Sequence, residues 1–284
     1  MARQPVMPTV GKRQLGRELR SLREASKFTL DRVAEELDWA KTKVHNLENG
    51  HWTRGNLTDL RALLDLYGVT DPQRRTALED LMRNAKKRGW WVEYGDALDG
   101  ALPAFEDEAS QISSYEPAVI PGLVQTPEYT AALLRTYPFL TAGEVERRVE
   151  ARMQRQRILD RDTPPEVSFV IEEAVVQRLV DTPVARAQIQ HLIDVAEAAN
   201  RVTLQVMPLR SGLHGALGPS FTLLDFAGDF DLSIVYTESA ARSAYLEDKA
   251  DVALYRTMFT HACGRALPPE KSIELLSGLL RQSS

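Results

Sequence analysis

The stretch RVAEELDWAKTKVHNLENG, residues 32–50, predicts a short helix, a tight turn and a second short helix. Ala34 is small at the place where we expect the two helices to approach most closely, and Asp38 and Trp39 are expected to form the turn. The apolar residues that recur at helical spacing, and that we expect to face inward, are Leu30, Val33, Leu37, Val44 and Leu47.

The outward face of the second helix is polar and carries no carboxylate. A helix in the major groove of DNA approaches phosphates on both sides, where Asn can pair with adenine and Lys with guanine. The loop NGHWTRGN, residues 49–56, adds Thr53 and Arg54 as candidate phosphate contacts. We favour a DNA-reading helix over an ordinary packed hairpin, and the candidate contacts on this helix are Lys41, Thr42, Lys43, His45 and Asn46.

Short apolar bursts on both sides of this stretch predict four short helices between Leu15 and Tyr67. Thr29 is the expected N-cap of the second helix, and Asn49 with Gly50 is the expected stop of the third. Asp71 before Pro72 indicates the start of a fifth helix that ends near Lys86.

Charge divides the 284-residue chain into two parts. Residues 1–92 hold 18 Lys+Arg against 12 Asp+Glu, whereas residues 93–284 hold 17 against 28. A basic amino-terminal module joined to an acidic body is typical of a protein that meets phosphate at one end only. No apolar run approaches the roughly 18 residues that a membrane span needs, and no apolar segment follows the first basic residues. We therefore expect a cytoplasmic protein that does not cross a membrane.

The fold class predicted from these patterns is mixed, with an all-α amino-terminal domain followed by a larger α+β domain. We place the first domain at residues 12–88, a linker at 89–104 and the second domain at 105–284. In the second domain, strands are predicted over 166–173, 202–209, 220–226 and 231–238. Helices are predicted over 104–116, from Pro127, and over 142–162, 183–200, 244–265 and 269–281.

Residues 30–50 resemble the helix-turn-helix of the lambda-repressor-like regulators, the XRE family. This resemblance implies that the helix from Ala40 to Asn49 is the recognition helix, with Lys41, Thr42 and Asn46 as candidates for base contacts. Asp38 departs from the family pattern, which usually has Gly at a turn position that requires positive φ. Aspartate tolerates that conformation better than most residues, so the fold is expected to survive the departure.

The resemblance extends into the second domain, where IPGLVQTPEY, residues 120–129, and GALGPSFTLLDF, residues 215–226, are specific blocks. They resemble an actinobacterial, Streptomyces-type family that includes WhiJ-like regulators. That family is described as antitoxin-like and is often encoded near a small partner protein. What the resemblance implies is transcriptional regulation; it does not settle what the large domain senses.

Residue types that could support catalysis occur in the second domain, but no catalytic motif does. Glu172, Glu173, His214 and Ser211 stand without a Gly-x-Ser-x-Gly elbow, a metal-spaced His pair or a phosphate-loop lysine. We expect no enzymatic activity, no cofactor and no metal. Cys263 is the only cysteine, which excludes a disulfide within the chain.

Two further segments have alternative interpretations. Gly212, Gly215 and Gly218 predict a strand connection that needs positive φ, with a solvated His214, or else a flap or anion-binding nest. The arginine-rich helix over 142–162 predicts a solvated face, since glutamates interleave with its arginines, or else a second nucleic-acid contact. We favour the strand connection and the solvated face.

The sequence thus predicts a sequence-specific DNA-binding transcriptional regulator that binds double-stranded DNA as a homodimer, because one such reader recognises only a few base pairs. The second domain is expected to mediate dimerisation and to bind an effector or a small protein. The alternative is an antitoxin-like interaction protein that binds and neutralises a small partner, with DNA binding for autoregulation.

Overall fold

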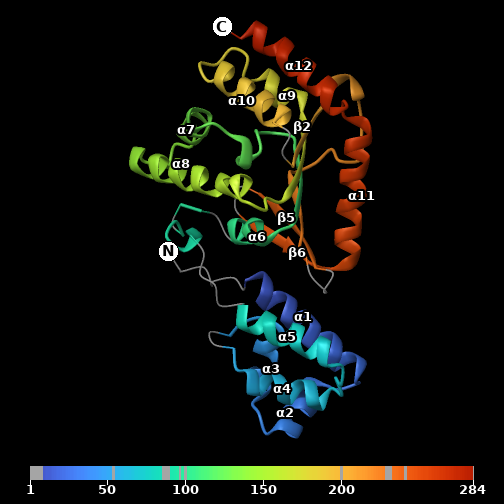
Figure 1. Cartoon of the computed structure of the whole chain (residues 1–284). Coiled ribbons are helices and arrows are strands. Elements are labelled where there is room, and N and C mark those ends of the chain that lie inside the picture. Colours follow the sequence, from blue (N-terminus) through green and yellow to red (C-terminus); the bar gives the residue numbers. More distant parts are fainter. Residues whose placement is uncertain are drawn as a thin grey trace. The chain divides into compact units, whose positions relative to one another are not determined.

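The computed structural model describes residues 9–52, 55–84, 90–95, 97–98, 101–198, 201–227, 232–239 and 242–283. The chain divides into two compact units, Met1–Val92 on one side and Glu93–Phe226 with Leu232–Ser284 on the other. The described part of the first unit is helical, and the second holds a mixed sheet with helices (Figure 1). This is the fold class predicted from the sequence.

Two helices of the first unit, α2 and α5, begin after the residues that the sequence predicts as their caps. Oγ1 of Thr29 accepts a hydrogen bond from the backbone N–H of Arg32 at 3.1 Å, and Oδ1 of Asp71 accepts one from the N–H of Gln73 at 3.0 Å, so both predicted caps are confirmed. Gly50 follows the third helix with φ of 70°. The helices are α1 (Val10–Ala25), α2 (Leu30–Leu37), α3 (Lys41–Glu48), α4 (Leu57–Leu66) and α5 (Pro72–Asn84).

One apolar core holds these helices together. Val33 and Val44 are fully buried, whereas Leu30 and Leu37 are only partly buried at its edge. The side chains predicted to face inward therefore do so, with a gradient of burial from the centre outward. The core includes Leu15, Leu19, Val33, Val44, Leu47, Leu60, Leu63, Leu64, Leu78 and Met82.

The turn between α2 and α3 has the left-handed backbone that the resemblance to a helix-turn-helix implies. Asp38 adopts φ 52° and ψ 48°. The next N–H, that of Trp39, reaches back to the carbonyl of Ala34 at 2.8 Å and closes the end of α2. A short polar residue thus occupies a conformation usually taken by glycine.

Helix α1 lies unusually close to the end of α3. A Cβ built on Gly16 would lie 2.8 Å from the carbonyl carbon of Glu48 and nearer still to its oxygen, so no other residue fits there without backbone movement. The side chain of Glu48 is buried beside α1, where Nε of Arg23 donates to Oε1 at 2.6 Å and Nη2 to Oε2 at 3.0 Å. The glycine permits the approach, and the ion pair satisfies the buried charge that results.

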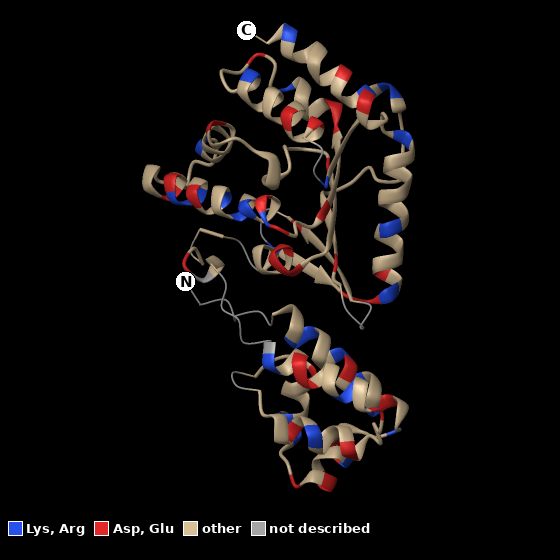
Figure 2. Ribbon diagram, in the orientation of Figure 1, with Lys and Arg blue, Asp and Glu red and all other residues tan. Residues whose placement is uncertain are grey.

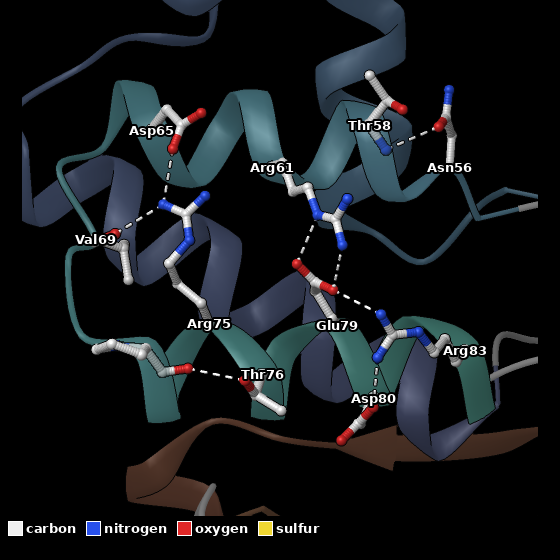
Figure 3. A network of polar contacts seen from close by, with 11 residues as sticks. Asn56, Thr58, Arg61, Asp65, Val69, Arg75, Thr76, Glu79, Asp80 and Arg83 are labelled. Carbon is white, nitrogen blue, oxygen red and sulfur yellow. Dashed lines mark hydrogen bonds and ion pairs between the residues drawn. The ribbon is translucent and has the colours of Figure 1, made fainter.

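A second polar network joins α4 to α5 (Figure 3). Glu79 accepts two hydrogen bonds from Arg61, at 2.7 and 2.8 Å, and a third from Arg83 at 2.7 Å. The hydrogen bond from Arg61 is the main cause that lowers the pKa of Glu79. Asn56 caps the start of α4 by accepting from the N–H of Thr58 at 2.9 Å.

The second unit is built on a six-stranded sheet with the order β3-β2-β1-β4-β5-β6. β1 pairs in parallel with β2, and β2 with β3, whereas β4, β5 and β6 continue the sheet in antiparallel fashion from β1. The strands are β1 (Gln111–Glu116), β2 (Glu166–Glu172), β3 (Val202–Met207), β4 (Phe221–Asp225), β5 (Ser233–Glu238) and β6 (Ser243–Leu246).

Helices cover both faces of this sheet (Figure 1). One face is covered by α6 (Leu102–Glu108), α7 (Pro127–Arg135), α8 (Ala142–Gln156), α9 (Glu173–Gln177) and α10 (Ala185–Glu197). The other face packs on α11 (Lys249–Arg265) through a core around Tyr115 and Phe221. Helix α12 (Pro269–Gln282) packs on α10 and β3.

Two predicted elements are wrong. The helix predicted over 104–116 ends at Glu108, and residues 111–116 form β1 in the middle of the sheet. Residues 112–115 of β1 are all buried, so both faces of this strand are covered. The sequence QISSYE therefore shows neither helical nor alternating periodicity. The helix predicted from Ala244 instead begins at Lys249, after Asp248 as its N-cap, because residues 243–246 form the edge strand β6.

Candidate DNA-binding site

Helix α3 presents one polar face outward while its opposite face fills the core. Val44 and Leu47 are buried, and the only carboxylate of the helix, that of Glu48, is turned inward to Arg23. The outward face of α3 therefore has no negative charge of its own, although basic and acidic residues are interspersed over the helices of this unit (Figure 2). Its exposed side chains are Lys41, Thr42, His45 and Asn46, with Lys43 half-exposed.

Lys41 stands in the first turn of α3 and pairs with Asp31 of α2. Its Nζ lies 2.8 Å from Oδ1 of Asp31, and both side chains are more than half exposed. An exposed ion pair contributes at most about 1 kcal/mol, so a phosphate or base edge can displace the aspartate at little cost. Asp31 thus orients Lys41 outward, and another anionic group can take the place of Asp31.

Lys43 points along the flank of the helix toward α4. Its Nζ lies 2.9 Å from Oδ1 of Asp59 and 3.7 Å from the ring centroid of Trp39. The indole face and the carboxylate together hold this ammonium group in one place. Lys43 therefore lies to the side of the outward face.

The carboxyl end of α3 carries polar contacts that the sequence did not predict. Nη2 of Arg20 donates to Oδ1 of Asn49 at 2.9 Å, and Nδ2 of Asn49 donates to the carbonyl of His45 at 2.7 Å. Arg20 belongs to α1 and lies far from Asn49 in the sequence, so no local pattern predicts this contact. It adds a positive charge at the end of the outward face.

The loop after α3 is held from α1 as well. Nζ of Lys12 donates to the carbonyl of Trp52 at 2.6 Å and lies 4.8 Å from the ring centroid of the same residue. Burial lowers the pKa of Lys12. Thr53 and Arg54, the phosphate contacts predicted for this loop, lie outside the described residues.

Two families account for most of the chain. Residues 14–78 match a family described as a helix-turn-helix domain. Residues 100–278, more than half of the chain, match a family described as Domain of unknown function (DUF5753). The chain belongs to the DUF5753 family. No curated protein and no solved structure matches it.

The two matches together describe a helix-turn-helix DNA-binding regulator whose DUF5753 domain has no known function. The helix-turn-helix match spans α2, the turn at Asp38 and α3. Among the described residues, none of the helices combines the length and the apolar composition that a bilayer crossing requires.

In the DUF5753 domain, two of the residues considered for catalysis lie together. Oε1 of Glu172 lies 3.0 Å from Nε2 of His214 and accepts a hydrogen bond from the Tyr115 hydroxyl at 2.8 Å. The His214 side chain is 2% exposed, which contradicts the expectation of a solvated loop histidine. Its Nδ1 is buried and has no partner among the described residues.

The other two candidates serve the same loop rather than this pair. Oε2 of Glu173 accepts from the N–H of Leu209 at 2.9 Å, and the Ser211 hydroxyl donates to the carbonyl of Arg265 at 3.2 Å. Of the three glycines, Gly212 has positive φ, 65°. Within the described part of the DUF5753 domain, no group of His, Cys, Asp and Glu is arranged to hold a metal ion.

Proposed function

We propose that this protein is a sequence-specific transcriptional regulator that inserts α3 into the major groove of double-stranded DNA. The observation that carries the proposal is the outward face of α3, which is polar and free of carboxylate within a matched helix-turn-helix domain. Lys41, Thr42 and Asn46 are the base-contacting residues in this proposal. The contacts to the DNA backbone are assigned to Lys43, His45, Thr53 and Arg54.

We further propose that the protein acts as a homodimer in the cytoplasm and has no enzymatic activity. A single helix-turn-helix reads a few base pairs, so two copies about one helical turn apart are needed for useful specificity. The predicted domain ranges, 12–88 and 105–284 with a linker between them, belong to this proposal. So does assignment to the WhiJ-like, XRE-type regulators of actinobacteria, with the DUF5753 domain mediating dimerisation and effector binding.

Asn46→Ala and Lys43→Ala should weaken DNA binding in different ways. Loss of an amide that pairs with one base is expected to cost about 1–3 kcal/mol on the cognate site and little on unrelated DNA. Loss of a backbone-contacting lysine is expected to weaken binding to all sequences alike and to reduce the salt slope by about 1. Titration of both variants on cognate and scrambled duplexes at two salt concentrations measures this. Equal losses on both duplexes for both variants would show that the roles are assigned wrongly.

A second candidate function is that of an antitoxin-like protein that binds and neutralises a small partner. It is favoured by an apolar groove of about 1120 Å³ in the DUF5753 domain. The groove lies between α7, α8 and α9, and its apolar lining includes Tyr129, Leu133, Val145, Val149, Val175 and Leu179. Co-expression with any small protein that is encoded next to this chain, in the absence of DNA, decides between the two candidates. A stoichiometric complex favours the antitoxin-like function, and separate elution of the two proteins argues against it.

A further inference from the structure

The apolar groove of the DUF5753 domain has the size and the lining of a small-molecule site. Its volume is about 1120 Å³, and α7 and α8, which form two of its sides, lie on the outer side of this unit, away from the strands (Figure 1). Small molecules bind mostly in apolar concavities of about 300–1000 Å³ that contain a few polar groups. The groove therefore has room for a bulky organic ligand.

The floor of the groove is apolar and already formed. The buried Tyr129 belongs to it, and the hydroxyl of this residue accepts a hydrogen bond from the N–H of Ile120 at 3.1 Å, which fixes the ring. Ala131 and Ala132 of α7 also line the groove, where they are half-buried. A ligand that enters the groove thus buries apolar surface against a floor that needs no rearrangement.

The wall that α8 contributes to the groove carries carboxylates and no arginine. Arg152 and Arg155 turn inward, where Nη1 of Arg152 donates to Oε1 of Gln125 at 3.0 Å and Nη2 of Arg155 donates to Oε1 of the buried Glu106 at 2.6 Å. The expectation of a purely solvated arginine face on this helix is therefore wrong. The side chains of α8 that line the groove are Val145, Glu146, Val149 and Glu150.

The carboxylates at the rim of the groove are unneutralised. Glu146 and Glu150 are four residues apart and therefore lie on the same side of α8. Glu128 of α7 lines the groove as well, and all three side chains are exposed. In the part of the chain that the structure describes, none of the three takes part in an ion pair.

Positive groups at the rim do not balance these carboxylates. The arginines that line the groove are Arg135 and Arg178, and Nη1 of Arg178 donates to the carbonyl of Ala118 at 3.1 Å. The lining thus holds three carboxylates against two guanidinium groups. Residues 93–284 as a whole hold 28 Asp+Glu against 17 Lys+Arg. Both the rim and the unit around it therefore favour a positively charged ligand.

We propose that this groove binds a bulky apolar organic cation, with its apolar body on the floor of the groove and its positive charge beside Glu146 and Glu150. The ring of Tyr129 in the floor also favours a cation over an anion, because the face of an aromatic ring is electronegative. The inference gives a chemical class to the proposed effector, and it rests on the proposed function only for the consequence that binding has at DNA.

The test measures binding of two organic ions to the full-length protein without DNA, by equilibrium dialysis and titration calorimetry. Tetraphenylphosphonium and tetraphenylborate have the same shape and opposite charge. Ala132→Phe places a ring in the groove, so the binding that this variant loses is the binding that belongs to the groove. In the groove, the phosphonium ion is expected to bind at least about tenfold more tightly than the borate ion. Equal binding of the two ions in the groove, or no loss of phosphonium binding in Ala132→Phe, overturns the proposal.

Charge variants test the assignment of the two glutamates. Glu146→Gln/Glu150→Gln is expected to weaken binding of the phosphonium ion about tenfold, the size of a charge interaction near a protein surface. The matched control is Glu197→Gln/Glu270→Gln, which removes the same charge from exposed positions of this unit that do not line the groove. Unchanged affinity in the first double variant, or an equal loss in the control, contradicts the proposal.

The remaining outcomes also decide. A small protein that forms a stoichiometric complex blocked by Ala132→Phe, while the phosphonium ion does not bind, assigns the groove to a protein partner and overturns the proposal. If circular dichroism shows that Ala132→Phe unfolds, the two double variants decide. Since DNA is absent from every measurement, failure here leaves the DNA-binding proposal untouched.

Discussion

Replacement of Glu48 by alanine is expected to lower the free energy of unfolding of the helix-turn-helix unit by about 3–5 kcal/mol, the usual cost of removing one partner of a buried ion pair. The Glu48 side chain is 3% exposed and that of Arg23 is 12% exposed, so the guanidinium group would remain mostly out of water without its carboxylate. The hydrogen bond that Arg23 donates to Glu48 is also the main cause that raises the pKa of Arg23. Amide hydrogen exchange in α1 and α3 of the full chain measures the loss.

The matched control is Glu36→Ala, which removes an ion pair of the same type from the surface. Glu36 pairs with Arg32 at 2.5 Å, but both side chains are more than a third exposed. The expected loss is at most about 1 kcal/mol, because water and salt screen such a pair. Equal effects of Glu48→Ala and Glu36→Ala would mean that the buried pair does not hold α1 against α3.

Gly16→Ala is the second substitution with a large expected effect. It is expected to destabilise the protein, although alanine has a higher helix propensity than glycine. Alanine in a helix interior normally gains about 1 kcal/mol over glycine. Here the new Cβ would lie 2.8 Å from the carbonyl carbon of Glu48, so α1 and α3 must separate. We expect a loss of about 3 kcal/mol, at the upper end of the range for overpacking because the obstacle is backbone.

Gly278→Ala controls for the propensity effect alone. Gly278 lies inside α12, and the nearest atom to its added Cβ is the end of a flexible arginine at 3.9 Å. This variant should become more stable by up to about 1 kcal/mol, measured by exchange of the α12 amides. Stabilisation by Gly16→Ala as well would show that the approach of α1 to α3 is looser than described.

Local pattern was enough to predict the helix-turn-helix. The periodicity of Val33, Val44 and Leu47 defines the buried faces within a few residues of chain, and Thr29 and Asp71 mark helix starts by their own side chains. The residues of α3 that do not belong to this buried pattern form its outward face. Which of its residues contact DNA stays a prediction.

Contacts between distant segments could not be predicted in this way. Glu48 looks like an ordinary solvent-facing glutamate at the end of a helix, because its partner Arg23 lies in another helix. Strand β1 was mistaken for helix because both of its faces are buried, which removes the alternation that identifies most strands. One polar cavity of the DUF5753 domain is lined by Glu116, Arg152 and Glu238, which come from three separate segments. No spacing in the sequence relates these residues.

Selection of genomic DNA fragments by the full-length protein, beside the Lys41→Ala/Asn46→Ala double variant, tests the central claim most directly. The account predicts one recurring palindromic site with half-sites about 10 base pairs apart, bound with a steep negative salt slope and not enriched by the variant. Enrichment of no site, or of the same site by both proteins, would contradict the claim that α3 reads DNA.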